Sequence, residues 1–200
     1  KVPFILDGDG NVHLYIHQDA KKEHIIDIVI NSKVQRPGVC NALETLLINS
    51  EIYQDMGSLI IEELLKNEVE LFVDEKIKQD FPNLNIANEL HYETEFLDLK
   101  LAVKVVDSVD HAIEHIKVYS TGHTEAVLTE SKDVADTFAK SIDSSVIFIN
   151  SSTRFTDGEM FGFGSEIGIS TQKLHVRGPM GLEALTNERY VVTGEGTVRG

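Results

Sequence analysis

The residue best suited to covalent chemistry is the single cysteine, Cys40, in the stretch QRPGVCNALETLL. A free thiol has a pKa near ~8.5, so nucleophilic work needs a nearby cation or backbone N–H donors that stabilise the thiolate. Arg36 lies close to it in the sequence, and Pro37 and Gly38 predict a turn that another group can approach closely. Alternatively, Cys40 is a small apolar filler. The loop setting favours a functional thiol, because a packing cysteine more often lies within a strand or helix.

A second candidate site is the segment NSSTRFTDGEMFGFGSEIG, residues 150–168. It follows an apolar run that predicts a buried strand, and open α/β sheets bind ligands beyond the carboxyl ends of their strands. Ser152, Thr153 and Arg154 offer hydroxyls and a forked guanidinium, which suit carboxylate or phosphate oxygens. Alternatively, this is a polar loop with aromatic side chains tucked beneath it. The length of the loop favours a function, since long irregular loops in compact domains usually have one.

Three other motifs are weaker. The stretch HAIEH, His111 to His115, matches the H-x-x-E-H zinc pattern, so a zinc hydrolase is an alternative function. Its helix also carries Asp110, Glu114 and Lys117, which is typical of a solvated face, and we expect no metal site there. The glycines of the GFG segment miss the dinucleotide spacing, and DGDGNV lacks the glycine and the glutamate that a calcium loop requires.

Predicted helices and short apolar strands alternate along most of the chain, which indicates an α/β fold with a mainly parallel sheet flanked by helices. Ser50, Ser108 and Ser131 are predicted helix N-caps. The expected helices cover residues 20–34, 51–67, 75–81, 109–118, 132–142 and 180–185. The expected strands cover residues 4–6, 12–16, 45–48, 69–73, 97–106, 125–129, 144–150 and 189–192, with 144–150 fully buried.

The composition is that of an ordinary globular protein, with 200 residues, 42% apolar and 26% charged. The net charge of -15 argues against a nucleic-acid or anionic-membrane partner, because both need a basic face. One cysteine cannot form an internal disulfide, which favours the reducing cytoplasm. The chain opens KVPFILDGDG without a methionine, so we expect it to be the C-terminal part of a longer protein or the product of cleavage.

Several long motifs together resemble the gamma-glutamyl phosphate reductase family of the aldehyde dehydrogenase superfamily. They are DGDGNVHLYI, NSKVQRPGVCNALETLL, EFLDLKLAVKVVDSVDHAIEHIKVYSTGHTEA, INSSTRFTDGEMFGFGSEIGISTQKLHVRGPMGLEALT and YVVTGEGTVR. Residues 106–127 are similar to that family's signature, with Val127 where isoleucine is usual. The resemblance implies an aldehyde dehydrogenase-like catalytic domain over residues 1–186, with 1–12 as the hinge from a cofactor domain. Residues 187–200 would be a C-terminal oligomerisation strand.

The resemblance also implies an activity. The Cys40 thiolate would attack L-glutamyl 5-phosphate, and NADPH would reduce the resulting thioester to glutamate 5-semialdehyde, in proline biosynthesis. Glu95 matches the glutamate that holds the nicotinamide ribose. We expect Ser152, Thr153, Arg154 and Arg36 to bind the substrate.

One departure and one absence follow from the same resemblance. Leu6 stands where hydrolytic relatives carry a glutamate base, so water attack on the thioester would lack a general base. The Rossmann-type cofactor domain of the family is not in this sequence, so the chain alone should bind NADPH poorly. A homo-oligomer, and a complex with the glutamate kinase of the pathway, are the partners implied. A non-catalytic assembly domain is the remaining alternative.

Overall fold

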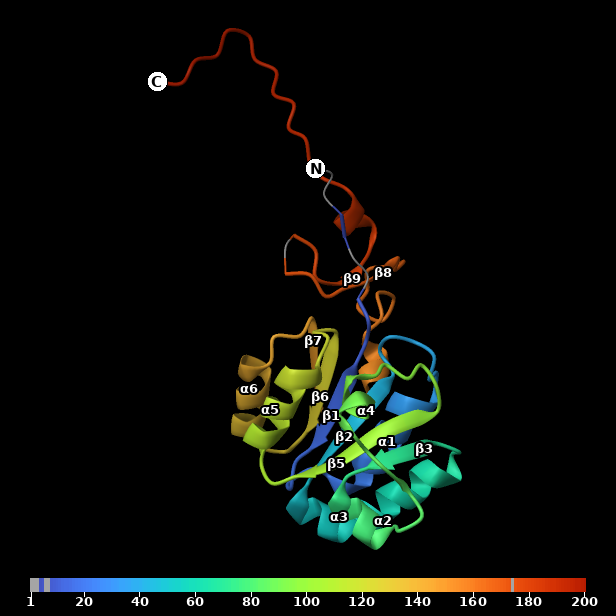
Figure 1. The fold of residues 1–200 in the computed structure, drawn as a ribbon. Helices are drawn as coiled ribbons and strands as arrows, with labels where there is room; N and C mark the ends of the chain where they lie inside the picture. The colour runs from blue at the N-terminus through green and yellow to red at the C-terminus, as the bar shows by residue number, and fades with distance from the viewer. Residues whose placement is uncertain (1–3, 6–7, 174) are drawn as a thin grey trace.

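The computed structural model describes residues 4–5, 8–173 and 175–200. Within these residues a seven-stranded, all-parallel sheet forms the centre of the fold, in the order β4-β3-β5-β2-β1-β6-β7 (Figure 1). Its strands are β1 (Val12–Ile16), β2 (Leu43–Asn49), β3 (Glu70–Val73), β4 (Asn85–Ile86), β5 (Lys100–Val106), β6 (Thr124–Leu128) and β7 (Val146–Ile149). The predicted α/β architecture is confirmed.

Helices cover both faces of the sheet. They are α1 (Lys22–Val34), α2 (Ser50–Lys66), α3 (Glu75–Asp80), α4 (Glu89–Glu93), α5 (Val109–Tyr119) and α6 (Lys132–Ser141). Residues of α1, α2 and α3 pack against one face in the larger apolar core, and residues of α5 and α6 pack against the other face in a second core. The central strands β1 and β2 are therefore buried on both sides, and every residue of both strands is buried, including the polar His13, Glu44, Thr45 and Asn49.

Capping explains where most helices begin. The side chains of Ser108 and Ser131 accept hydrogen bonds from backbone N–H groups of α5 and α6, as the sequence predicts. The prediction for α2 is wrong by one residue, since Asn49 is the N-cap and its side chain accepts from Glu51 N–H at 2.9 Å. The strand expected from Leu97 begins at Lys100, because Leu97 adopts a positive φ of 52° that no strand accommodates.

The C-terminal part differs most from the prediction. A two-stranded antiparallel ribbon, β8 (Gly168–Ser170) and β9 (Gly178–Met180), was not expected. The helix expected near residues 180–185 is a short 3₁₀ turn, η2 (Leu182–Leu185). The strand expected at residues 189–192 is not formed within this chain, where this segment extends away from the fold (Figure 1). β7 is half-buried rather than buried, because it is the last strand of the sheet.

No helix in the described parts of the chain is long and apolar enough to cross a bilayer. The strand expected at residues 4–6 falls partly on Leu6, which lies outside the described residues, and Phe4 and Ile5 are in no strand.

Candidate active site

Cys40 lies in the turn between α1 and β2, at the amino end of the sheet. The turn starts after α1 ends at Val34 and closes with a hydrogen bond from Ala42 N–H to Val39 O at 2.9 Å. Cys40 is partly exposed, whereas Asn41 beside it is buried. The expectation of a site beyond the carboxyl end of a strand concerned residues 150–168, not Cys40. A helix-to-strand connection, not a strand-to-helix connection, carries the thiol.

Gly10 brings the segment before β1 against this turn. A Cβ atom built on Gly10 would lie 1.6 Å from the carbonyl oxygen of Cys40, so only a glycine fits. The Gly10 N–H donates to the Glu95 carboxylate at 2.8 Å. Glu95 is partly exposed and lies between α4 and β5. Gly10 thus connects the predicted nucleophile with the predicted cofactor-binding residue.

The segment that follows β7 returns toward the same end of the sheet through the 3₁₀ turn η1 (Thr153–Phe155). The Thr153 hydroxyl donates to Asn41 O at 2.8 Å, and the Asn41 side chain donates to Thr156 O at 2.7 Å. The Ser32 hydroxyl of α1 donates to the Ser152 hydroxyl at 3.2 Å and accepts from Thr153 N–H at 3.3 Å. These buried bonds fasten the segment to the residue next to Cys40.

Arg154 projects from this segment close to the thiol. Its Nε donates to Gln35 Oε1 at 2.7 Å, just before the Cys40 turn. Burial and the neighbouring Arg36 lower the pKa of the Arg154 guanidinium from its usual value, whereas Asp157 and Cys40 act in the opposite direction. Because an arginine stays protonated in proteins, Arg154 is a cation within electrostatic reach of Cys40, and Arg36 is a second cation within reach of Arg154. A site with this charge favours an anionic substrate and stabilises a thiolate.

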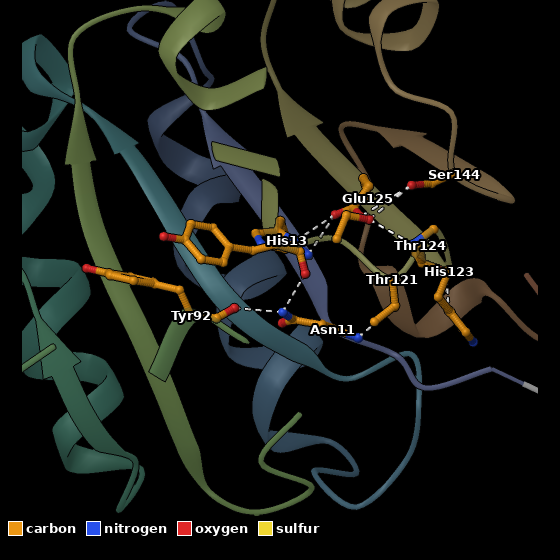
Figure 2. Close-up of polar contacts among 11 residues, drawn as sticks. Asn11, His13, Tyr92, Thr121, His123, Thr124, Glu125 and Ser144 are labelled. Carbon is orange, nitrogen blue, oxygen red and sulfur yellow. Dashed lines mark hydrogen bonds and ion pairs between the residues drawn. The ribbon is translucent and has the colours of Figure 1, made fainter. Parts of the chain in front are cut away.

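A buried polar network supports the neighbouring strands at the same end of the sheet (Figure 2). The Glu125 carboxylate accepts from His13 N–H at 2.9 Å and lies 3.1 Å from His13 Nδ1. The hydroxyls of Ser120 and Ser144 donate to its other oxygen. Every residue of the network except Ser120 is buried, and these bonds join β1, β6 and the approach to β7. Within the signature-like stretch, these bonds explain how the charged Glu125 is accommodated without exposure to solvent.

The two histidines of the HAIEH stretch occupy different environments. His111 is exposed, and its Nδ1 lies 4.0 Å from an oxygen of Asp107. His115 is buried among the rings of His13, Tyr92 and Tyr119. Among the described residues, no group of three or more histidine, cysteine, aspartate or glutamate side chains is arranged to hold a metal ion. The zinc alternative therefore has no set of ligands in this part of the chain.

The structure thus brings most of the predicted site residues to one place. Cys40, Arg36 and Arg154 interact electrostatically, and Glu95 is linked to them through Gly10. The hydroxyls of Ser152 and Thr153 are buried and hydrogen-bonded within the chain, and both residues adjoin or precede Arg154 in the same segment. Sequence reasoning missed Gly10 and Asn41, although Asn41 is adjacent to the cysteine. Leu6 lies outside the described residues.

Solved structures of low sequence identity share this fold. An acetylating aldehyde dehydrogenase from Geobacillus thermoglucosidasius is 18% identical, with a TM-score of 0.72 over 98% of this chain and 53% of that chain. At this identity the likeness concerns the fold alone, and it defines an aldehyde dehydrogenase-like α/β domain. No protein-family model matches the chain.

More similar proteins are all of one kind. The gamma-glutamyl phosphate reductase of Thermoanaerobacter pseudethanolicus is 50% identical over 198 residues, which is 99% of this chain and 48% of that protein. The crystal structure of the Thermotoga maritima gamma-glutamyl phosphate reductase is 48% identical, with a TM-score of 0.94 over all of this chain and 48% of that one. The chain is therefore similar to gamma-glutamyl phosphate reductases over nearly its whole length, and it spans about half the length of the relatives it matches.

Proposed function

We propose that this chain is the catalytic portion of an NADPH-dependent reductase that converts L-glutamyl 5-phosphate to L-glutamate 5-semialdehyde in proline biosynthesis. The observation that carries the proposal is the Cys40 turn, where a partly exposed thiol lies beside Arg36 and Arg154. The identity of about half with named reductases over nearly the whole chain supports the choice of substrate.

In the proposed reaction the Cys40 thiolate attacks the acyl carbon of glutamyl phosphate. The bond from that carbon to the phosphate oxygen breaks, phosphate leaves with the electron pair, and a thioester forms on Sγ. Arg36 and Arg154 neutralise the phosphate as it leaves, and Ser152 and Thr153 hold Arg154 in place. NADPH, when bound, supplies the hydride that reduces the thioester. The carbon–sulfur bond then breaks, which releases the aldehyde and restores the thiolate.

Glu95 is the residue of this chain that we assign to the cofactor. A carboxylate suits the hydroxyl groups of a ribose, and Glu95 is partly exposed and fixed by Gly10 next to the Cys40 turn. The rest of the cofactor site would come from a domain outside residues 1–200, for which residues 1–12 would be the hinge.

A phosphate-dependent assay in the reverse direction tests the proposal. The full-length protein that contains this chain should reduce NADP⁺ in the presence of glutamate semialdehyde and phosphate. Cys40→Ala should abolish the activity. Equal activity of the Cys40→Ala protein would refute the proposed role of the thiol, and no activity with arsenate or phosphate in the parent protein would refute the proposed reaction.

We further propose that residues 187–200 pair with a second copy of the chain. Tyr190, Val191 and Val192 are 83%, 75% and 91% exposed, and apolar side chains this exposed favour burial against a partner. Deletion of residues 187–200 should reduce the particle size measured by light scattering, and an unchanged size would refute this role. We also propose that the protein makes transient contact, in the cytoplasm, with the glutamate kinase that makes its substrate. The reason is that an acyl phosphate hydrolyses readily.

A further inference from the structure

A buried ion pair closes the loop that carries Cys40. Lys33 lies in the last turn of α1 and Glu44 lies in β2, so the pair joins the two ends of the turn. Lys33 Nζ lies 2.7 Å from Glu44 Oε2, and both side chains are completely buried. Removing two charges from water is costly, and apolar residues of similar volume often give equal or greater stability at such positions. Stability alone is therefore a weak explanation for this pair.

The second oxygen of Glu44 reaches the other half of the site. Glu44 Oε1 accepts from Leu97 N–H at 3.2 Å, and Leu97 has a left-handed backbone with φ of 52°. A non-glycine residue adopts this conformation only where its surroundings hold it. Leu97 lies two residues after Glu95, so the bond to Glu44 fixes the segment that presents the Glu95 carboxylate.

These contacts connect the segments around the site in a ring. Glu44 binds the Glu95 segment, Glu95 accepts from Gly10 N–H, and Gly10 packs on the backbone of Cys40. The bond from Lys33 Nζ to Glu44 Oε2 then connects the segment before the Cys40 turn to this ring. Burial and, to a smaller extent, Glu95 raise the pKa of Glu44 to about 7 against the opposing effects of Lys33 and the Leu97 N–H. Burial lowers the pKa of Lys33, while Glu44 and Asp98 raise it.

We propose that Lys33 and Glu44 are positioning residues, which set the Cys40 thiol and the Glu95 carboxylate in the relative arrangement that the reaction needs. The inference rests on the proposed function, because it assigns both groups to one reaction. It extends that function, because it assigns to a fully buried ion pair the role of holding the Cys40 turn and the Glu95 segment in a fixed relative position.

The test replaces the pair with apolar residues of similar volume, Lys33→Met together with Glu44→Leu, in the full-length protein. If the pair only supports folding, this double variant keeps both its melting temperature and its chemistry. If the pair positions the site, the melting temperature stays close to that of the parent while kcat falls about tenfold to a hundredfold, as expected when a reacting group moves by about 1 Å. The KM for NADP⁺ should also rise, because the Glu95 segment loses its bond to Glu44.

Two further variants keep the test decisive. Glu44→Gln retains an acceptor for Leu97 N–H but removes the charge that faces Lys33, so its KM for NADP⁺ should stay close to the parental value while its kcat falls. It replaces the double variant if that protein does not fold. Tyr53→Phe is the matched control, because it removes a hydrogen bond to Asp80 between α2 and α3, away from the Cys40 turn. Its kcat and KM should match those of the parent.

The outcomes separate the two proposals. Parental kinetics in a folded double variant, or a parental kcat in folded Glu44→Gln if the double variant is unfolded, would overturn the positioning role and leave the reductase proposal intact. Absence of Cys40-dependent activity in the parent protein itself would instead refute the proposed function.

Discussion

Replacing Gly10 with alanine would place a methyl group 1.6 Å from the carbonyl oxygen of Cys40 and 2.4 Å from its carbonyl carbon. Both atoms belong to the backbone, so no side-chain rotation can relieve the overlap. Since non-bonded heavy atoms prefer separations of about 3.5–4 Å, the two segments must move apart by roughly 1.5–2 Å. That movement would also weaken the hydrogen bond from Gly10 N–H to Glu95, which is 2.8 Å long.

The expected cost of this substitution has two parts. Overpacking of a close contact costs about 1–3 kcal/mol, and loss of a hydrogen bond to a charged group costs about 1.5–3 kcal/mol. We expect Gly10→Ala to lower the free energy of unfolding by about 2.5–6 kcal/mol in urea titrations. Iodoacetamide labelling of Cys40 should also change in rate in the folded protein, because the turn that holds the thiol moves.

Gly38 provides the matched control in the same turn. A Cβ atom on Gly38 would meet only Leu97 O, at 3.5 Å, and its φ is not positive. Gly38→Ala should therefore be neutral or stabilise by about 0.4–1 kcal/mol through the unfolded chain. Equal urea midpoints for the two variants, with Cys40 labelled at the parental rate in both, would refute the close approach of Gly10 to the Cys40 turn.

Two further predictions concern charge and pH. Arg154→Gln should lower kcat/KM for the phosphate substrate about tenfold to a hundredfold, because a charge-assisted bond to the leaving phosphate contributes about 1.5–3 kcal/mol; an unchanged kcat/KM in steady-state assays would remove Arg154 from the anion site. Burial lowers the pKa of His115 to about 2, with His13 and Lys104 adding to the shift. Because the unfolded imidazole titrates near ~6.5, the stability that this neutral residue contributes is present above about pH 6.5 and is lost as the pH falls below it. His115→Leu should reduce this acid sensitivity by up to about 1.4 kcal/mol per pH unit in urea titrations between about pH 6.5 and 5, and an identical slope in the parent protein would contradict the assignment.

Local signals in the sequence predicted most of the fold. Ser108 and Ser131 mark the starts of α5 and α6 because a cap acts on the next few residues, and the apolar runs of β1 and β2 reflect burial on both faces of the sheet. The ribbon of β8 and β9 was missed because its strands are three residues each and contain glycine and proline.

The sequence indicated most residues of the candidate site, but not where in the fold they come together. Cys40 and Arg154 stood out by residue type. The rule about carboxyl ends was applied only to the segment that carries Arg154, and it does not describe the Cys40 turn, which lies at the amino end of the sheet. Their assembly depends on contacts between distant segments, such as Gly10 against Cys40 and Thr153 to Asn41, and periodicity carries no information about these. Lys33 and Glu44 are ordinary helix and strand residues in the sequence, so only the fold reveals that they form a buried pair.

The most direct test of the central claim is detection of the acyl group on Cys40. The full-length protein, incubated with glutamyl phosphate and no NADPH, should release phosphate once per chain and carry a glutamyl thioester on the tryptic peptide that contains Cys40. Hydroxylamine should remove the modification, and Cys40→Ala should show neither phosphate release nor the modified peptide. A thioester-free Cys40 peptide alongside continued reduction of the substrate on addition of NADPH would contradict the account.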